Sequence, residues 1–204
     1  MKMRIAAALF IAGLAGAASA QQPPKADPVV VAKIIADTFK SASDEWKARI
    51  SPDETQQICS QFRDVPPKDL FDKVLAREKA TLAFPADGKV LGDWRQGEKL
   101  AQRGTGGQFS DTAQTPKGGN CYACHQMTKA EISFGNIGPS LYQYGKLRGN
   151  SQEVIKYTWG KIWDSSAYAA CSNMPRFGHK GILTEAQIRD VMALLLDPAS
   201  PVNE

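Results

Sequence analysis

Five consecutive residues, from Cys121 to His125, constrain this chain more than any other part of its sequence. They read Cys-Tyr-Ala-Cys-His. Two thiols at this spacing can add across the two vinyl groups of a haem, and the histidine that follows can reach the iron from one side. The pattern therefore predicts one covalently attached haem c, tethered by Cys121 and Cys124, with His125 as an axial ligand of the iron.

Two other uses of a Cys-x-x-Cys pair fit the chain less well. A structural zinc site takes about four Cys or His ligands, whereas this chain has four Cys and two His in total, and Cys59, Cys171 and His179 are scattered. A redox-active dithiol of the thioredoxin type would lie beside a βαβ pattern, and the sequence shows no convincing strand. We therefore expect haem rather than zinc or a redox-active dithiol.

The N-terminus has the pattern of a secretory signal peptide at residues 1–20. Lys2 and Arg4 give a basic start, an apolar run follows, and Ala18-Ser19-Ala20 is a small-residue cleavage site. No later apolar run reaches the length of about 18 residues needed to span a bilayer. We expect a mature chain that is exported to the periplasm, a compartment that also permits disulfides.

Hydrophobic periodicity predicts an all-α fold in two parts. Residues 21–90 would form a helical N-terminal extension, and residues 91–204 would form the haem domain. A Pro- and Gly-containing connector at 84–92 separates the two parts. The expected helices cover about 29–50 with a break at 41–44, a segment from 52 to Val65, and then 68–80, 94–102, 151–163 and 184–197.

Local signals mark the ends of several of these helices. Ser51 and Glu54 fit a capping box at the start of the second helix, and Thr184 and Gln187 fit one at the start of the last. Gly97 lies inside a helix, where glycine costs about 1 kcal/mol relative to alanine. We expect a glycine at this position if another helix crosses at close range.

The turn at Gly138-Pro139 is the expected support for His125. A ligating histidine uses one ring nitrogen for the metal and almost always donates the other N–H to an acceptor. The turn can offer a backbone carbonyl, and Pro139 has no N–H that would compete. The alternative is that the Gly-Pro pair is only a turn.

Met174 is the expected ligand on the other side of the iron. It lies in a long polar loop and is followed by a proline, and a thioether ligand raises the reduction potential of a haem. His179 and Cys171 are its rivals, whereas Met127 lies too near His125 to cross the haem plane. With His and Met ligands the iron has no open position, so such a haem transfers electrons and binds no substrate.

Cys59 and Cys171 are left over once the haem is attached. In an oxidising compartment an even leftover pair favours a disulfide. It would link the N-terminal helices to the loop that carries Met174. The alternative is two separate thiols, with Cys59 packed in a helix face.

Three motifs together resemble a known family. They are 120–125 (Asn-Cys-Tyr-Ala-Cys-His), 135–141 (Gly-Asn-Ile-Gly-Pro-Ser-Leu) and 173–178 (Asn-Met-Pro-Arg-Phe-Gly). Over about 91–198 the chain resembles class I cytochromes c, and the combination of motifs is similar to the SoxX family, the monohaem subunits of the SoxAX cytochromes of bacterial sulfur oxidation. No motif in the extension carries this resemblance.

The resemblance implies an activity and partners. In that family the complex is an L-cysteine S-thiosulfotransferase, which oxidatively joins thiosulfate to a cysteine of the carrier protein SoxYZ. The catalytic haem belongs to the SoxA partner, and the SoxX subunit accepts electrons and passes them to another cytochrome. This chain would then have no catalytic residues of its own.

Two other functions stay open from the sequence. One is a free periplasmic electron carrier without a permanent partner, and the other is an enzyme or sensor with a labile sixth ligand. The extension favours a docking partner, because a simple electron shuttle does not need three more helices.

The charge balance gives no reason to expect nucleic acid as a partner. The chain carries 25 basic and 21 acidic residues, and loss of Lys2 and Arg4 with the signal peptide leaves 23 against 21. Nucleic-acid-binding proteins present a clustered basic face, which this balance does not indicate. The basic side chains that could frame a haem edge are Lys117, Lys129, Lys146, Arg148, Arg176 and Lys180.

Overall fold

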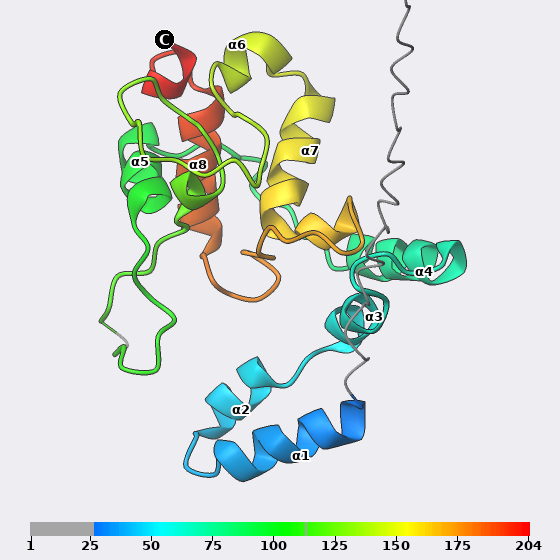
Figure 1. Ribbon diagram of the computed structural model, residues 1–204. Coiled ribbons are helices and arrows are strands. Elements are labelled where there is room, and N and C mark those ends of the chain that lie inside the picture. Colours follow the sequence, from blue (N-terminus) through cyan, green and yellow to red (C-terminus); the bar gives the residue numbers. More distant parts are fainter. Residues whose placement is uncertain (1–26, 113) are drawn as a thin grey trace, which may run out of the picture. The chain divides into compact units, whose positions relative to one another are not determined.

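The computed structural model describes residues 27–112 and 114–204, and these residues form helices and loops without any strand (Figure 1). The all-α fold is therefore confirmed. The expected signal peptide lies outside the described residues. Within them, no helix is long and apolar enough to cross a membrane. The chain divides into two compact units, residues 1–40 and residues 41–204.

The described part of the first unit, residues 27–40, contains helix α1 (Pro28–Thr38). Asp27 caps it by accepting a hydrogen bond from the Val29 amide at 2.8 Å. None of its residues is buried. The apolar face that periodicity predicted over residues 29–50 is therefore not a core face in α1.

The second unit begins with α2 (Asp44–Ile50) and α3 (Glu54–Phe62). The break expected within 29–50 is present, because residues 39–43 separate α1 from α2. The capping box predicted for the next helix is wrong by two residues. Asp53 and Gln56 form the box of α3, whereas the Ser51 hydroxyl donates to the Lys47 carbonyl at the end of α2.

Helix α4 (Lys68–Lys79) follows the predicted range of 68–80 closely. Val74 is fully buried, and the other apolar side chains expected to point inward, Leu70, Phe71 and Leu75, are partly buried. The helix carries a buried carboxylate, Glu78, in its last turn. This side chain becomes important where α4 meets the loop around Met174.

Helices α5 (Trp94–Gln102) and α8 (Glu185–Leu196) cross at close range. At Gly97 an added Cβ would lie 2.2 Å from the Asp190 carbonyl oxygen of α8, so only glycine permits the crossing. The predicted capping box of α8, formed by Thr184 and Gln187, is present. The buried face of α8 includes Ile188, Val191, Met192, Leu194 and Leu195.

Helix α7 (Gln152–Trp163) completes the core, and the short α6 (Tyr144–Arg148) precedes it. Trp159 is fully buried in α7, and its indole N–H donates to the Ala83 carbonyl at 2.7 Å. The Trp163 indole donates in the same way to the Thr81 carbonyl at 3.0 Å. Both tryptophans therefore attach α7 to the segment that follows α4.

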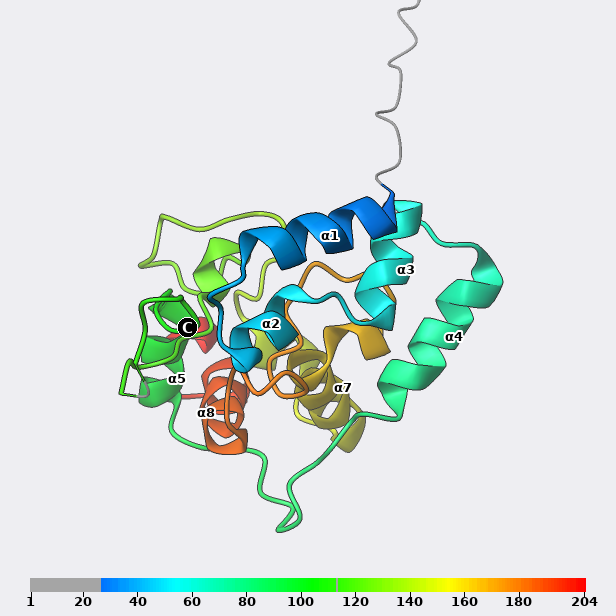
Figure 2. The same ribbon diagram turned by 90° about the horizontal axis from the view of Figure 1, so that it is seen from below.

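The long loop between α7 and α8, drawn in orange, passes beside α3 and α4 in two perpendicular views (Figures 1 and 2). A disulfide between Cys59 of α3 and Cys171 of the loop fixes this arrangement. Residues 41–90 and the haem domain thus share one compact unit. The position of the loop that carries Met174 therefore depends both on the haem domain, to which it belongs, and on α3 and α4.

Candidate haem site

The Cys-x-x-Cys-His segment folds as a single tight turn. Residues Cys121–Ala123 form a short 3-10 helix, and the amides of Cys124 and His125 both donate to the Cys121 carbonyl, at 3.1 and 2.9 Å. The Gly138 amide donates to the Cys124 carbonyl at 2.8 Å. The two thiols and the imidazole are therefore presented by one backbone unit, and the Gly-Pro turn is bonded to it.

Tyr122, between the two cysteines, anchors this turn to the core. Its ring is buried, and its hydroxyl lies 3.0 Å from a Glu98 carboxylate oxygen on α5 and 3.2 Å from the Thr128 hydroxyl. Burial raises the pKa of Glu98 in spite of the hydrogen bonds from Tyr122 and Gln102. Sequence reasoning missed this contact, because the residues between the two cysteines have no fixed identity in the attachment pattern.

The Gly138-Pro139 turn orients His125, as the sequence predicted. Its Nδ1 lies 2.7 Å from the Pro139 carbonyl oxygen. The ring also packs against the Gly138 backbone, where an added Cβ would lie 2.2 Å from Cε1 and 2.7 Å from Nε2. With Nδ1 engaged as the donor, Nε2 is the nitrogen left for a metal.

The environment of Cys121 does not suit a redox-active dithiol. Burial raises the pKa of the Cys121 thiol to about 12, and the nearby Cys124 adds to the shift. Reactive cysteines have a lowered pKa and an electropositive surrounding. The pair is better suited to a covalent tether than to thiol–disulfide exchange.

Met174 lies in the loop between α7 and α8, partly buried against the same hydrophobic core that Cys121 borders. Its carbonyl accepts a hydrogen bond from the Ser165 hydroxyl, and its amide donates to the Ser172 hydroxyl at 3.3 Å. Both bonds fix the backbone and leave the thioether free to act as a ligand.

One rival of Met174 is disulfide-bonded, and the other lies near two carboxylates. Cys171 is bonded to Cys59 with an S–S distance of 2.06 Å, so the predicted disulfide is present and no thiolate is available there. A ring nitrogen of His179 lies within 4.8 Å of carboxylate oxygens of Glu78 and Asp164. His179 thus lies near carboxylates, the disulfide excludes Cys171 as a ligand, and Met174 as the second ligand stays a prediction.

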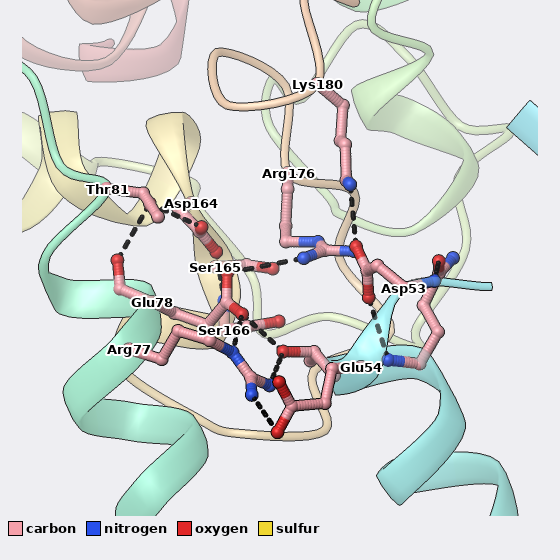
Figure 3. A network of polar contacts seen from close by, with 12 residues as sticks. Asp53, Glu54, Arg77, Glu78, Thr81, Asp164, Ser165, Ser166, Arg176 and Lys180 are labelled. Atoms are coloured by element: carbon pink, nitrogen blue, oxygen red, sulfur yellow. Dashed lines mark hydrogen bonds and ion pairs between the residues drawn. The ribbon is translucent and has the colours of Figure 1, made fainter. Parts of the chain in front are cut away.

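Arg176 does not frame an exposed edge, as the sequence suggested it could. Its side chain is 8% exposed and forms ion pairs with Asp53 at 2.6 Å and with Glu78 at 3.3 Å (Figure 3). Lys180 is more exposed and also bonds Asp53, at 2.6 Å. The reason for the error is that the two carboxylates come from a distant part of the sequence.

These residues fit a covalently bound haem. Two adjacent thiols, an imidazole with a free Nε2 and a thioether in a fixed loop form the donor set of a c-type haem with His and Met ligands. The space beside the Gly138 backbone is filled by the His125 imidazole, and a Cβ on residue 138 would occupy the same space.

Two comparisons with known proteins give matches to this chain. Residues 91–197 match the model of the family described as cytochrome c. The chain is also 38% identical to a protein of Aquifex aeolicus (strain VF5) described as an uncharacterized lipoprotein, over 211 residues that cover 100% of both chains. That similarity therefore includes the segment before residue 91.

Proposed function

Since the chain belongs to the cytochrome c family, and so carries covalently bound haem c and transfers electrons, we propose that it is the monohaem, SoxX-like subunit of a thiosulfate-oxidising SoxAX-type complex. In this role it accepts electrons when a SoxA-type partner joins thiosulfate to a cysteine of a SoxYZ-type carrier, and it passes them to another cytochrome. The whole complex is the enzyme, and this chain has no catalytic residue.

The observation that carries the proposal is the fixed His125 imidazole, supported by the Pro139 carbonyl at 2.7 Å and followed in sequence by the Met174 motif. Cys121 and Cys124 would hold the haem through thioether bonds, and His125 and Met174 would be the protein ligands of its iron. When bound, the haem supplies one-electron chemistry at its iron. The two protein ligands leave no position for substrate, which favours electron transfer.

We place the protein in the periplasm. The disulfide between Cys59 and Cys171 suits an oxidising compartment, and thioether attachment takes place outside the bacterial inner membrane. The expected signal peptide at residues 1–20 agrees with export. The description of the Aquifex relative as a lipoprotein also supports an envelope location.

A free periplasmic electron carrier is the second candidate, and one structural observation favours it. The argument for a permanent partner was that a simple shuttle needs no N-terminal extension. Helices α3 and α4 make buried contacts with the Met174 loop of their own chain. The extension therefore has a use inside this molecule, whether or not a partner binds.

An affinity pull-down of the tagged mature protein from native periplasm, followed by haem staining of a gel, separates the two candidates. A second, larger haem-stained band at fixed stoichiometry supports the SoxAX-type complex, and thiosulfate with the SoxYZ-type carrier should then reduce the haem. A single haem band near the mass of the mature chain would favour the free carrier.

A further inference from the structure

Contacts from other elements fix the backbone on both sides of Met174. Before it, Cys171 is bonded to Cys59 of α3. After it, Arg176 is buried. At Met174 itself the carbonyl accepts from the Ser165 hydroxyl. A loop of this length would otherwise be the part of the domain best able to move.

Arg176 is the attachment that reaches two helices at once. One terminal nitrogen lies 2.6 Å from Asp53 Oδ2 and the other lies 3.3 Å from Glu78 Oε2 (Figure 3). Asp53 caps α3 and Glu78 lies in the last turn of α4. Because separating a buried pair leaves an uncompensated charge, the loop cannot leave these helices without a large loss of free energy.

Glu78 is in turn fixed by its own neighbours. Its carboxylate bonds Arg77 Nε at 3.2 Å and accepts a hydrogen bond from the Thr55 hydroxyl. Asp164 accepts from the Thr81 hydroxyl at 2.9 Å. Thr81 follows α4, and Asp164 directly precedes Ser165, whose hydroxyl donates to the Met174 carbonyl. A second set of contacts therefore connects the end of α4 to the Met174 backbone.

We propose that Arg176 is a positioning residue for the sixth haem ligand, and that Asp53 of the α3 cap and Glu78 of α4 hold the Met174 thioether in place through it. The inference rests on the proposed function, because it requires Met174 to be that ligand. A neutral thioether in a loop has only its own bond to the iron to hold it there. We call the ion pairs of Arg176 with Asp53 and Glu78 the clamp. When they are present, detachment of Met174 from the iron also requires these buried ion pairs to break.

The test uses the oxidised and reduced holoprotein with its disulfide intact. Arg176→Met removes both ion pairs at similar side-chain length, and Arg176→Lys restores one charge without the fork that reaches two carboxylates. Ser165→Ala removes only the bond to the Met174 carbonyl and leaves every buried charge paired. Arg189→Met is the matched control, since Arg189 also pairs with two carboxylates, Asp87 and Glu185, but lies on α8.

Two readouts report Met174 directly: the far-red sulfur-to-iron charge-transfer band of the ferric protein, and carbon monoxide binding to the ferrous protein. In Arg176→Met we expect the ratio of Met-detached to Met-bound protein to rise at least about tenfold, which corresponds to 1.4 kcal/mol. Arg176→Lys should recover part of this change, and Ser165→Ala should move both readouts in the same direction by a smaller factor. Arg189→Met should leave both unchanged.

The outcomes separate the inference from the function on which it rests. A charge-transfer band in the parent protein that persists unchanged in Arg176→Met and Ser165→Ala overturns the clamp alone. If Arg176→Met does not fold, a charge-transfer band and carbon monoxide binding that both stay unchanged in Arg176→Lys overturn the role of Arg176. A parent protein without the band overturns the assignment of Met174 as a ligand, and the clamp with it.

Discussion

Two backbone groups of the Gly138-Pro139 turn hold the His125 imidazole in place. The Pro139 carbonyl lies 2.7 Å from Nδ1, and the Gly138 backbone lies so close to the ring that a Cβ would be 2.2 Å from Cε1. The first fixes the rotation of the ring, and the second requires that no side chain project from residue 138. The sequence predicted the carbonyl, because ligating histidines need an acceptor, but it could not predict the contact with Gly138.

Gly138→Ala should therefore displace the imidazole from its position. Loss of such supporting contacts typically weakens a metal–ligand bond 10- to 100-fold, so we expect the ratio of high-spin to low-spin ferric haem to rise by roughly that factor. Electron paramagnetic resonance measures the ratio. Gly149→Ala is the control, because its φ of +73° also disfavours alanine but no atom lies within 4 Å of the added Cβ. Equal spectra for the two variants would contradict the role of Gly138.

Asp53 should make stability depend on pH in the acid range. Burial alone would raise its pKa, but hydrogen bonds from Lys180, the Gln56 amide and Arg176 outweigh burial and lower the pKa to about 2. Its usual pKa in an unfolded chain is about 3.9. The contribution is therefore fully present above about pH 4 and is lost as the pH falls through about 2.

Asp53→Asn keeps a good helix cap and removes the charge. Since solvent screens the partly exposed carboxylate, we expect it to lower the free energy of unfolding by about 1–2 kcal/mol at neutral pH and by much less near pH 2. Urea unfolding at the two pH values measures this. The exposed ion pair of Asp87 with Arg189 provides a control, since Asp87→Asn should change stability little at either pH. A destabilisation by Asp53→Asn that does not vary with pH would contradict the assignment.

At the scale of the elements, the crossing of α5 and α8 builds the framework on which the haem turn rests. Two opposed effects decide what Gly97→Ala would do. Alanine favours a helix by about 1 kcal/mol over glycine, whereas overpacking a tight contact costs about 1–3 kcal/mol. With the Cβ placed 2.2 Å from the Asp190 carbonyl and 3.0 Å from the Leu194 Cβ, the second effect should win.

We therefore expect Gly97→Ala to lower the melting temperature by several degrees. Gln96→Ala, at an exposed position of the same helix, should leave it nearly unchanged. Differential scanning calorimetry of the two holoproteins gives the comparison. An alanine at position 97 that stabilises the protein would show that the helices can separate without loss, which would contradict the close crossing.

The helices also show where local sequence signals are sufficient. The last helix was predicted together with its capping box of Thr184 and Gln187, because both residues lie at the start of the helix and no other pair there fits a capping box. At α3 two readings fit, because Ser51 with Glu54 and Asp53 with Gln56 share the same spacing. In the structure Asp53 caps α3, and its carboxylate also pairs with Arg176, 123 residues away. A pattern confined to one helix cannot rank alternatives that a distant partner decides.

At the scale of the whole molecule, residues before position 90 contact both α7 and the loop that follows it. The disulfide, the ion pairs of Arg176, and the indole bonds of Trp159 and Trp163 all join residues 53–83 to residues 159–176. Such a network is expected to unfold as one cooperative unit. In the parent protein, helical circular dichroism and the sulfur-to-iron band of the haem should therefore be lost together on denaturation.

Replacing both Cys59 and Cys171 by alanine tests how much of this cooperativity depends on the covalent link. The disulfide closes a loop with a sequence separation of 112 residues, for which chain entropy alone gives about 4–5 kcal/mol, an upper value because measured gains are often smaller. We expect a loss of stability of up to about 4 kcal/mol. The sulfur-to-iron band should then disappear at a lower denaturant concentration than the helical signal, because the loop has lost its covalent link to α3 and is held by ion pairs and hydrogen bonds.

Coincident transitions in the double variant would show that the ion pairs suffice to keep the loop and helices in one unit. Separate transitions already in the parent protein would show instead that residues 41–90 unfold as a domain of their own. In that case the boundary predicted near residue 90 would be a boundary of stability as well as of sequence. Because the disulfide is present in the structure and the indole bonds do not depend on it, we expect a single transition in the parent and a divided one only after its removal.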